Sequence, residues 1–389
     1  MAFGAHLSLF DIEIFLKFMN RSVIHVINGE LYSGAERVQD LLATQLPGFG
    51  YDVGFACLKL DKFAEKMQAK SARLHSLPMS SRFDLSAGFK LANIVRDFNY
   101  QIIHTHTPRA AMVGKIASAL SRVPMVHHVH SPTARDTESG LRNKINAFVE
   151  NASLVGVRRL IPVSSSLKTY LVESGYKQDR IQVVPNGVPT PGPMPERDAP
   201  TPEFVVGSVA LFRPRKGVEI LLKAVALLRS NGLPVRLRCV GPFETEAYEA
   251  EVKSLVRLLK IDDYVEWTGF TSNVGHELRN MDVFVLPSLF GEGMPMVILE
   301  AMANGVPVIA SDVEGIPEIL SGGAGVVVPP RSETSLAEAL KNLLSDPRGW
   351  RSLRETAYQR QSERFSDRAM AHGVARIYDH FFEENPALI

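Results

Sequence analysis

The fold is decided by the stretch LPSLFGEGMPMVILEAMANGVPVIASDVEGIPEIL, residues 286–320. It contains an apolar strand, a loop with two glycines, an apolar helix and a second apolar strand, VPVIAS. Pro295 is predicted at the first helical position, because its fixed φ suits a helix start and its missing N–H costs nothing there. Asn304 and Gly305 are predicted to end the helix. This order is typical of a βαβ unit in a parallel sheet.

The same alternation of strands and helices extends along the whole chain, which predicts two parallel sheets. The first half has short β-branched runs at 23–27, 52–58, 101–106, 124–130, 159–164 and 181–185. The second half has the runs FVVGSVALF, VRLRCVG, YVEWTGF, VFVLPS, VPVIAS and GVVVPP. Between the halves, a segment rich in proline has no periodicity and predicts an interdomain linker.

We therefore expect an α/β protein with two Rossmann-like, doubly wound domains that face each other across a cleft. The length of 389 residues exceeds what one hydrophobic core usually supports. The expected parts are an extension at 1–18, an N-terminal domain at 19–190, a linker at 191–203, a C-terminal domain at 204–365 and a C-terminal helix at 366–389 that packs back on the N-terminal domain.

Composition narrows the class of protein. Lys and Arg number 43 against 42 Asp and Glu, so no overall field favours a nucleic acid as partner. Cys57 and Cys239 are the only cysteines, which fits a reducing compartment and offers no disulfide framework or metal-ligand spacing. The sequence contains no uninterrupted run of eighteen apolar residues, so no membrane-spanning helix is predicted. We expect a cytoplasmic protein.

One region is basic, with eleven Lys and Arg against five Asp and Glu between 101 and 180. A solvated face explains this excess in the simpler interpretation. In the sharper one, the first domain presents a surface to an anionic acceptor or to the inner face of the membrane as a peripheral protein. Residues 1–18 are either a mobile tail or an amphipathic helix that packs on the protein or rests on a membrane.

The junction between the loop and the helix at 291–296 is the strongest candidate site. Free backbone N–H groups and the positive end of a helix dipole bind phosphate there, and Gly293 lets a ligand approach the main chain. Glu292 can accept hydrogen bonds from sugar hydroxyls beside a diphosphate. Glu300 lies in an otherwise apolar helix, where a carboxylate needs a partner such as a ribose diol. The alternative is a surface Glu292 and a Glu300 in a structural salt bridge.

The segment EGMPMVILEAMANGVPVIAS resembles the signature of retaining glycosyltransferases of family 4, which have the GT-B fold. Glu292 and Glu300 match the paired-glutamate motif of that family, and the resemblance covers roughly residues 22–385. It implies that Glu292 contacts the transferred sugar and Glu300 the nucleotide ribose. The main chain of Gly293, Met294 and Pro295 would then meet the diphosphate.

Cations at the start of another helix form a second candidate. Arg213, Arg215 and Lys216 crowd a helix N-terminus, where positive charge is disfavoured unless an anion sits among them. Lys216 followed by glycine resembles the diphosphate-binding pair of the family. The family usually has an arginine five residues before this lysine, where this chain has Leu211. We interpret Arg213 as its substitute; a solvated basic turn is the alternative.

Two glycine positions resemble further family segments. Gly34, in Ser33-Gly34-Ala35-Glu36 after the first strand, could approach the leaving phosphate of the donor, although an ordinary tight turn explains it equally well. Gly269 and Phe270 match the segment beside the nucleobase, and a plain strand-ending turn is the alternative. The turn at 186–187 is interpreted as structural, and the segment Gly-Ile-Pro-Glu at 315–318, which also resembles a family segment, is assigned no chemistry.

Five of the eleven histidines lie between 104 and 130. Alternation in VHHVH places His128 and His130 on one face of a strand and His127 on the other. His130 ends the strand at its carboxyl end, where open α/β sheets bind ligands. The resemblance implies a position near the reacting sugar for His130, with His106 as a secondary candidate. A zinc site is possible in principle, but the third ligand that it needs has no evident spacing. His104, His127 and His128 are interpreted as satisfied core or surface residues.

The resemblance implies transfer of a hexose-type sugar, with retention of configuration, from a nucleotide diphosphate sugar. Uridine is the base most frequent in the family. The acceptor would be a glycan, a lipid-linked glycan or a small molecule. No metal or other cofactor is expected, since the chain has no Asp-x-Asp motif and the cations and helix N-terminus can stabilise the leaving diphosphate.

Three alternatives stay open. An NAD-dependent oxidoreductase would need Gly-x-Gly-x-x-Gly after a strand, and the first strand is followed instead by NGELYSG. A nucleotide-sugar epimerase of the same fold would form its product without an acceptor. An inactive sugar-nucleotide-binding protein is disfavoured by the pair Glu292 and Glu300, although Leu211 and Ser33 depart from the family pattern.

Overall fold

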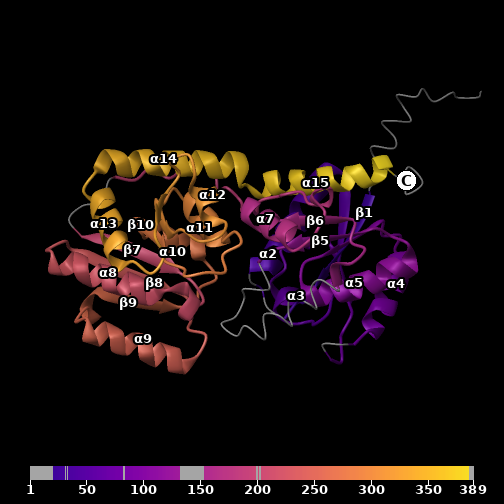
Figure 1. The fold of residues 1–389 in the computed structure, drawn as a ribbon, viewed down its shortest axis with the longest axis horizontal. Coiled ribbons are helices and arrows are strands. Elements are labelled where there is room, and N and C mark those ends of the chain that lie inside the picture. Colours follow the sequence, from indigo (N-terminus) through magenta and orange to yellow (C-terminus); the bar gives the residue numbers. More distant parts are fainter. Residues whose placement is uncertain are drawn as a thin grey trace, which may run out of the picture. The chain divides into compact units, whose positions relative to one another are not determined.

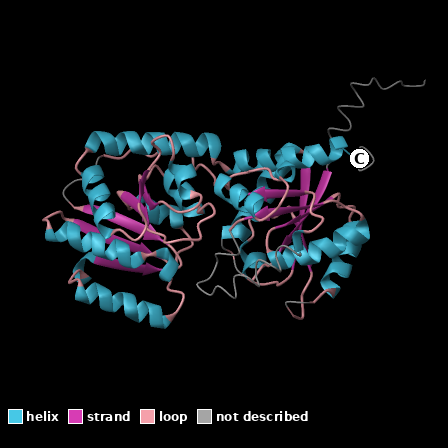
Figure 2. Cartoon of the chain, viewed as in Figure 1, coloured by secondary structure: helices cyan, strands magenta, loops and turns pink. Residues whose placement is uncertain are grey.

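The computed structural model describes residues 21–30, 32, 34–81, 84–131, 153–198, 200 and 203–384. The chain divides into two compact units. The first unit comprises the described parts of Met1–Pro162, Leu171–Val184 and Asp367–Ile389, and the second comprises those of Val163–Tyr170 and Pro185–Ser366. Each unit contains one six-stranded parallel sheet flanked by helices, as the alternation predicted (Figures 1 and 2).

The sheet of the first unit has the strand order β3-β2-β1-β4-β5-β6. Its strands are β1 (Arg21–Ile27), β2 (Tyr51–Cys57), β3 (Arg73–Ser76), β4 (Ile102–Thr105), β5 (Met125–Val129) and β6 (Arg159–Pro162). The edge strand β3 escapes prediction because its sequence, RLHS, is short and largely polar. All neighbouring strands are parallel, so their carboxyl ends share one edge.

The strand predicted at 181–185 is wrong. Ile181 forms an isolated bridge with Leu160, and the Val184 N–H donates to the Pro162 carbonyl at 3.1 Å. A continued ladder would also need an N–H from Pro162, which a proline lacks. The segment therefore runs beside β6 without becoming a strand.

The helices of the first unit follow the expected alternation. They are α2 (Gly34–Gln45), η1 (Leu46–Phe49), α3 (Lys62–Lys66), α4 (Ser86–Asp97), α5 (Pro108–Ser121), η3 (Gln178–Arg180) and α15 (Asp367–Glu384); α7 (Ser165–Glu173) begins in the second unit and ends in the first. The C-terminal helix α15 packs on the first unit. Its Asp379 accepts hydrogen bonds from Arg21 and from the Tyr51 hydroxyl, each at 2.7 Å.

The sheet of the second unit has the order β12-β11-β10-β7-β8-β9. Its strands are β7 (Phe204–Val209), β8 (Val235–Val240), β9 (Val265–Gly269), β10 (Val283–Leu286), β11 (Val308–Ser311) and β12 (Val326–Val328), one for each predicted run. Its helices are η4 (Pro214–Lys216), α8 (Val218–Ser230), α9 (Glu246–Leu258), η5 (Asp262–Tyr264), α10 (Val274–Arg279), α11 (Met296–Ala303), α12 (Ile316–Leu320), α13 (Glu333–Leu344) and α14 (Pro347–Arg364). Every residue of β10 and β11 is buried, as expected for a parallel sheet covered on both faces.

The described part of the predicted linker is fastened to the second unit. Arg354 donates to the Pro195 carbonyl at 2.7 Å, and Arg197 forms an ion pair with Asp282 at 3.0 Å. Because prolines leave carbonyl groups without partners in a regular structure, arginine donors can hold such a segment in place. The predicted extension at 1–18 lies outside the described residues. In the described part of the chain, no helix is both long and apolar enough to cross a bilayer.

Candidate active site

The backbone angles of Gly291 and Pro295 shape the loop between β10 and α11. Gly291 has φ +79°, in the left-handed region that favours glycine. Pro295 caps α11 with φ −70° and ψ 116°, so the helix begins at Met296, one residue later than predicted. The extended ψ of Pro295 causes this shift. Asn304 and Gly305 end the helix as predicted, with φ +63° at Gly305.

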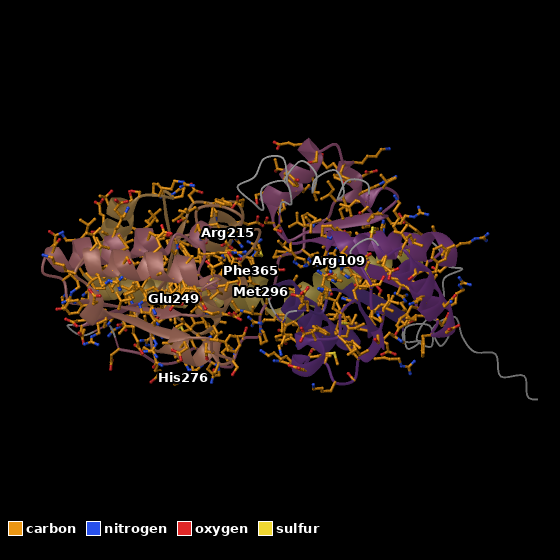
Figure 3. The ribbon with its side chains drawn as sticks, turned by 90° about the horizontal axis from the view of Figure 1, so that it is seen from below. Arg109, Arg215, Glu249, His276, Met296 and Phe365 are labelled. Atoms are coloured by element: carbon orange, nitrogen blue, oxygen red, sulfur yellow. The ribbon has the colours of Figure 1, made fainter. Side chains whose placement is uncertain are left out.

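Main-chain N–H groups without acceptors indicate that this junction is an anion-binding site. Within the described residues, nothing accepts a hydrogen bond from the N–H of Gly293, Met294 or Met296. Such unused donors at the start of a helix, together with its dipole, favour a phosphate group. Figure 3 locates the junction by Met296 and the adjacent turn by Arg215.

Glu292 is a buried carboxylate with three donors on one oxygen. Its side chain is 6% exposed, and its Oε1 accepts hydrogen bonds from the Lys216 ammonium, from the Ser288 hydroxyl at 2.7 Å and from Arg215 at 3.4 Å. Burial raises the pKa of Glu292, but the charges of Lys216 and Arg215 outweigh burial and hold the pKa below its ordinary value. Burial likewise lowers the pKa of Lys216, against the opposing effect of Glu292. The site is therefore a charged, paired cluster.

The turn η4 supplies the cations of this cluster. Gly217 follows Lys216 with φ +64°, and a Cβ there would collide with the Pro287 carbonyl oxygen. The Leu289 N–H donates to the Arg215 carbonyl at 2.8 Å, which fixes the turn against the loop. A glycine after Lys216 is therefore required by this close contact as well as by its backbone conformation.

The arginine that reaches the loop differs from the one that the sequence favoured. Arg215 donates to the Gly291 carbonyl at 3.1 Å and contacts Glu292, whereas Arg213 forms an ion pair with Glu244 at 3.4 Å. Both arginines flank the same proline, so sequence position alone does not separate them. The role of Arg213 at a diphosphate stays a prediction. Leu211 has an exposed side chain.

The loop also contacts Glu314, which the sequence did not indicate, and Gly315, to which the sequence assigned no chemistry. Glu314 accepts a hydrogen bond from the Glu292 N–H at 3.1 Å, and the Gly315 N–H donates to the Glu292 carbonyl at 3.1 Å. A Cβ on Gly315 would collide with the Gly293 carbonyl oxygen. The residues before α12 therefore support the candidate site directly. The only sequence signal is the glycine that follows Glu314.

Asn186 fixes the other side of the loop. Its side-chain amide donates to the Met294 carbonyl at 3.0 Å, and Met294 itself is buried. Both residues lie in the second unit. This contact fixes the peptide between Met294 and Pro295, directly before α11, which gives the predicted structural turn at 186–187 a part in shaping the site.

The other predicted donor-binding residues lie in positions open to a ligand. Glu300 is half-buried on α11, whose remaining residues are mostly buried. Gly269 ends β9 with φ +68°, and Phe270 beside it is 68% exposed. Gly34 is exposed at the start of α2, where an added Cβ would meet no atom within 4 Å. Ser33 lies outside the described residues.

The first unit brings five histidines together on one face of its sheet. His25 of β1 pairs in register with His104 of β4, and His104 pairs with Val126 of β5. Since side chains alternate along a strand, His106, His128 and His130 share that face. His127 lies on the other face, where its Nδ1 is 2.8 Å from the Thr105 hydroxyl.

Hydrogen bonds connect four members of this histidine cluster to a tyrosine. His130 Nε2 is 3.1 Å from His106 Nδ1, and His106 Nε2 is 3.2 Å from His25 Nδ1. The Tyr378 hydroxyl is 3.3 Å from His25 Nε2 and 2.5 Å from His104 Nδ1. Burial lowers the pKa of His130 to about 4, which keeps it neutral at pH 7. His130 and His106, the two candidates from sequence, are therefore in direct contact.

The other three histidines are buried, as a core position requires, but not all of their ring nitrogens have hydrogen-bond partners. His104, His127 and His128 are all buried. His127 has its partner in Thr105, and one nitrogen of His104 has its partner in Tyr378. Neither nitrogen of His128 has a partner among the described residues. The pairing of β4 with β5 brings His106 close to His128 and His130, a proximity that the spacing along the chain does not show.

Two parallel α/β units, one of them with unused main-chain N–H groups at a helix N-terminus, are typical of nucleotide-binding proteins. The sequence matches the family described as Glycosyltransferase Family 4 over residues 32–190 and that described as Glycosyl transferases group 1 over residues 203–346. The alpha-maltose-1-phosphate synthase of Mycolicibacterium smegmatis is 30% identical over 305 residues, which span 71% of this chain and 78% of that protein. The chain belongs to these glycosyltransferases.

Further similarities agree with this assignment. The UDP-Gal:alpha-D-GlcNAc-diphosphoundecaprenol alpha-1,3-galactosyltransferase of Escherichia coli is 26% identical over 317 residues, which span 75% of this chain and 80% of that protein. The crystal structure of Anabaena Alr3699/HepE in complex with UDP-glucose matches with a TM-score of 0.79 at 21% identity, over 92% of this chain and 99% of that one. This last likeness establishes the GT-B fold.

Proposed function

We propose that this glycosyltransferase transfers a hexose from a UDP-sugar, with retention of configuration, and that the second unit binds the donor. One observation carries the proposal. The unused N–H groups of Gly293, Met294 and Met296 begin a helix, and two cations and the buried carboxylate Glu292 lie beside the same loop. Amide donors and positive charge suit the diphosphate of a nucleotide sugar, and a carboxylate suits the hydroxyls of its sugar.

The cations would stabilise the charge that develops on the leaving diphosphate. Lys216 and Arg215 are both largely buried, so their interaction with an anion is weakly screened by water. Arg213 would add a third positive charge if it left Glu244 for the diphosphate. Because these groups and the helix N-terminus already supply positive charge, we propose that transfer proceeds without a metal ion at the diphosphate.

Glu292 would change partners when the donor binds. In the described structure its carboxylate neutralises Lys216 and Arg215. A bound diphosphate would offer those cations another anion and free the carboxylate oxygens for the hydroxyls of the sugar. Glu300 would accept hydrogen bonds from the ribose diol, and the exposed ring of Phe270 would stack on the base beside Gly269.

For the first unit we propose the acceptor role that the resemblance implies, with His130 near the reacting sugar and Gly34 near the donor phosphate. A glycan carried by a lipid diphosphate is the acceptor that we favour. The support is the name of the Escherichia coli relative, whose acceptor is a sugar on diphosphoundecaprenol.

We propose contact with an anionic membrane, at its cytoplasmic face, through a depression of the first unit in which Arg159 is paired with Glu384 and two further arginines lie beside one aspartate. The depression has a volume of about 380 Å³ and is lined by Arg158, Arg159 and Arg180 together with Asp179 and Glu384. Arg159 begins β6, so the depression lies at the amino edge of the sheet, opposite the edge where His130 lies. Contact there would leave the carboxyl edge accessible.

Co-sedimentation with lipid vesicles tests this membrane contact. We expect the wild type to sediment with anionic vesicles but not with neutral ones, and the double variant Arg158→Glu/Arg180→Glu to lose this binding. Equal sedimentation of the double variant and the wild type would contradict the proposed contact.

The function is tested by thermal unfolding with a panel of nucleotides and nucleotide sugars. A ligand at a hundred times its dissociation constant adds about 2.7 kcal/mol of stability. We expect uridine diphosphate and a UDP-hexose to raise the melting temperature, and the Glu300→Ala variant to bind UDP about 10- to 100-fold more weakly, since hydrogen bonds to a charged group contribute about 1.5–3 kcal/mol. Glu203→Ala, which removes an exposed carboxylate of the same unit, is the matched control.

Three results would contradict the proposal. Stabilisation by NAD alone would favour an oxidoreductase, and an altered UDP-sugar formed without acceptor would favour an epimerase. A chain that binds the donor but transfers nothing to any lipid-linked, glycan or small-molecule acceptor would be an inactive binding protein.

A further inference from the structure

The histidine cluster of the first unit contains a set of nitrogen atoms suited to a metal ion. We propose that His106, His128 and His130 form a binding site for a divalent transition-metal ion, for which zinc is the best match. The inference concerns the first unit alone and does not depend on the proposed transfer reaction.

Distances support this trio. One ligand atom from each of the three histidines lies within 4.8 Å of the other two, and His106 Nδ1 is 3.1 Å from His130 Nε2. Zinc binds imidazole nitrogens at about 2.0–2.1 Å in tetrahedral sites, which places the nitrogens about 3.3 Å from one another. The closest pair is therefore already at the separation that a shared ion requires.

His128 supplies the strongest argument. It is fully buried, and neither of its nitrogens has a partner among the described residues. Burying an imidazole without hydrogen bonds is unfavourable, so such a side chain needs a partner that the protein itself does not provide. A metal ion shared with His106 and His130 would occupy one nitrogen.

The contacts behind the trio would orient a ligand. When His106 binds through Nδ1, its Nε2–H can donate to His25 Nδ1 at 3.2 Å, and His25 Nε2–H can then donate to the Tyr378 oxygen at 3.3 Å. The Tyr378 hydroxyl can in turn donate to His104 Nδ1 at 2.5 Å. Each group in this series is used once as a donor. Histidines that bind metals commonly have such a partner on the second nitrogen, which fixes their tautomer.

The chemistry of the ligands selects the class of metal. All three donors are imidazole nitrogens, which suit zinc, copper, nickel and iron, whereas magnesium and calcium require oxygen ligands. His130 is partly exposed and gives the ion a route from solvent.

A second trio, His25, His104 and His106, has the same spacing and shares His106. The structure favours the first set for two reasons. The Tyr378 hydroxyl already occupies His25 Nε2 and His104 Nδ1, and all three residues of the second trio are buried away from solvent. The two trios are distinguished by His128, which belongs to the first one only.

The experiment measures zinc affinity of the full chain, purified without a polyhistidine tag and stripped with a chelator. Competition with a chromophoric chelator gives the affinity, and visible absorption of the cobalt-loaded protein reports the coordination geometry. We expect one tight zinc ion per chain. His128→Leu should weaken binding about 100-fold or more, and His25→Phe, which removes the contact behind His106, about 10- to 100-fold.

The matched control is His127→Asn, which changes the adjacent histidine on the opposite face of β5 and keeps a polar group near Thr105. His276→Gln controls for binding at the surface, since His276 is exposed on α10 of the second unit (Figure 3). Both should bind zinc like the wild type. Absence of stoichiometric zinc in the wild type would overturn the proposal, as would equal affinity of His127→Asn and His128→Leu. Circular dichroism of each variant before zinc addition excludes unfolding as the cause of lost binding.

Discussion

The two units bury polar side chains in opposite ways. In the second unit, the buried carboxylate of Glu292 is met by Lys216, Arg215 and Ser288, so its charge is compensated. In the first unit, the buried rings of the histidine cluster are neutral, and His128 has no partner among the described residues. A cation that is paired with a carboxylate can exchange that partner for an anionic ligand. A neutral imidazole has a nitrogen lone pair that can bind a metal ion instead. The difference predicts an anionic ligand for one unit and a metal ion for the other.

The largest effect is expected at Glu292. Its replacement by alanine should lower kcat about 100- to 1,000-fold, because an interaction that strengthens in the transition state is lost. The dissociation constant of UDP should change less than about tenfold, since Glu292 is proposed to contact the sugar and not the nucleotide. Initial rates of transfer and calorimetric titration with UDP measure the two quantities. Unchanged turnover would end the comparison, because the paired carboxylate would then have no part in chemistry.

A double-mutant cycle tests the pairing itself. Glu292→Gln leaves Lys216 buried without its counter-ion, and Lys216→Met leaves Glu292 with a weaker one. Each should lower the free energy of unfolding by about 3 kcal/mol, and the double variant should lose less than the sum. The exposed pair Lys253 and Glu249, on α9, is the control and should show a far smaller coupling. Strict additivity at Glu292 and Lys216 would show that the pair does not stabilise the fold.

Acid should remove this stabilisation selectively. The folded-state pKa of Glu292 lies below its ordinary value of 4.5, so the ionised group stabilises the fold fully above that pH and less as the pH falls through the lowered pKa. The difference in unfolding free energy between wild type and Glu292→Gln should therefore be constant near neutral pH and shrink below about pH 4.5. Urea unfolding at several pH values measures it. A difference that grows on acidification would mean that burial, not the cations, dominates the pKa.

The sequence predicts local structure well where one pattern settles it. The apolar strands around residues 286–311, the loop between them and the helix end at Asn304 and Gly305 all follow from short-range periodicity and backbone preference. The helix start predicted at Pro295 is wrong by one residue. Proline fixes φ but leaves ψ free, and the ψ of Pro295 is extended. The edge strand β3 has no apolar alternation to detect.

Contacts that depend on strand order are beyond such patterns. Sequence spacing does not reveal that His25 pairs with His104, because β1 and β4 are neighbours only through the order of the sheet. The same holds for Glu314, which reaches the Glu292 N–H from the loop after β11. Arg213 and Arg215 are equally plausible from charge, and only the conformation of η4 decides which one contacts the loop.

The smallest effect separates the two faces of a single strand. In buffer without metal, His127→Leu should lose about 1 kcal/mol of unfolding free energy, because the hydrogen bond with Thr105 disappears. His128→Leu should be at least as stable as wild type, since leucine has a similar volume and no nitrogen to bury unpaired. Chemical denaturation measures both variants.

Zinc should then reverse the order of the two variants. The ion stabilises any chain that binds it only when folded, so wild type and His127→Leu gain stability while His128→Leu does not. If His128→Leu is instead the less stable variant without metal, the His128 ring has a partner in the protein, and the contrast between a compensated and an uncompensated unit disappears. If zinc raises the stability of all three chains equally, the ion binds elsewhere. The neutral face of the first unit would then be packing alone.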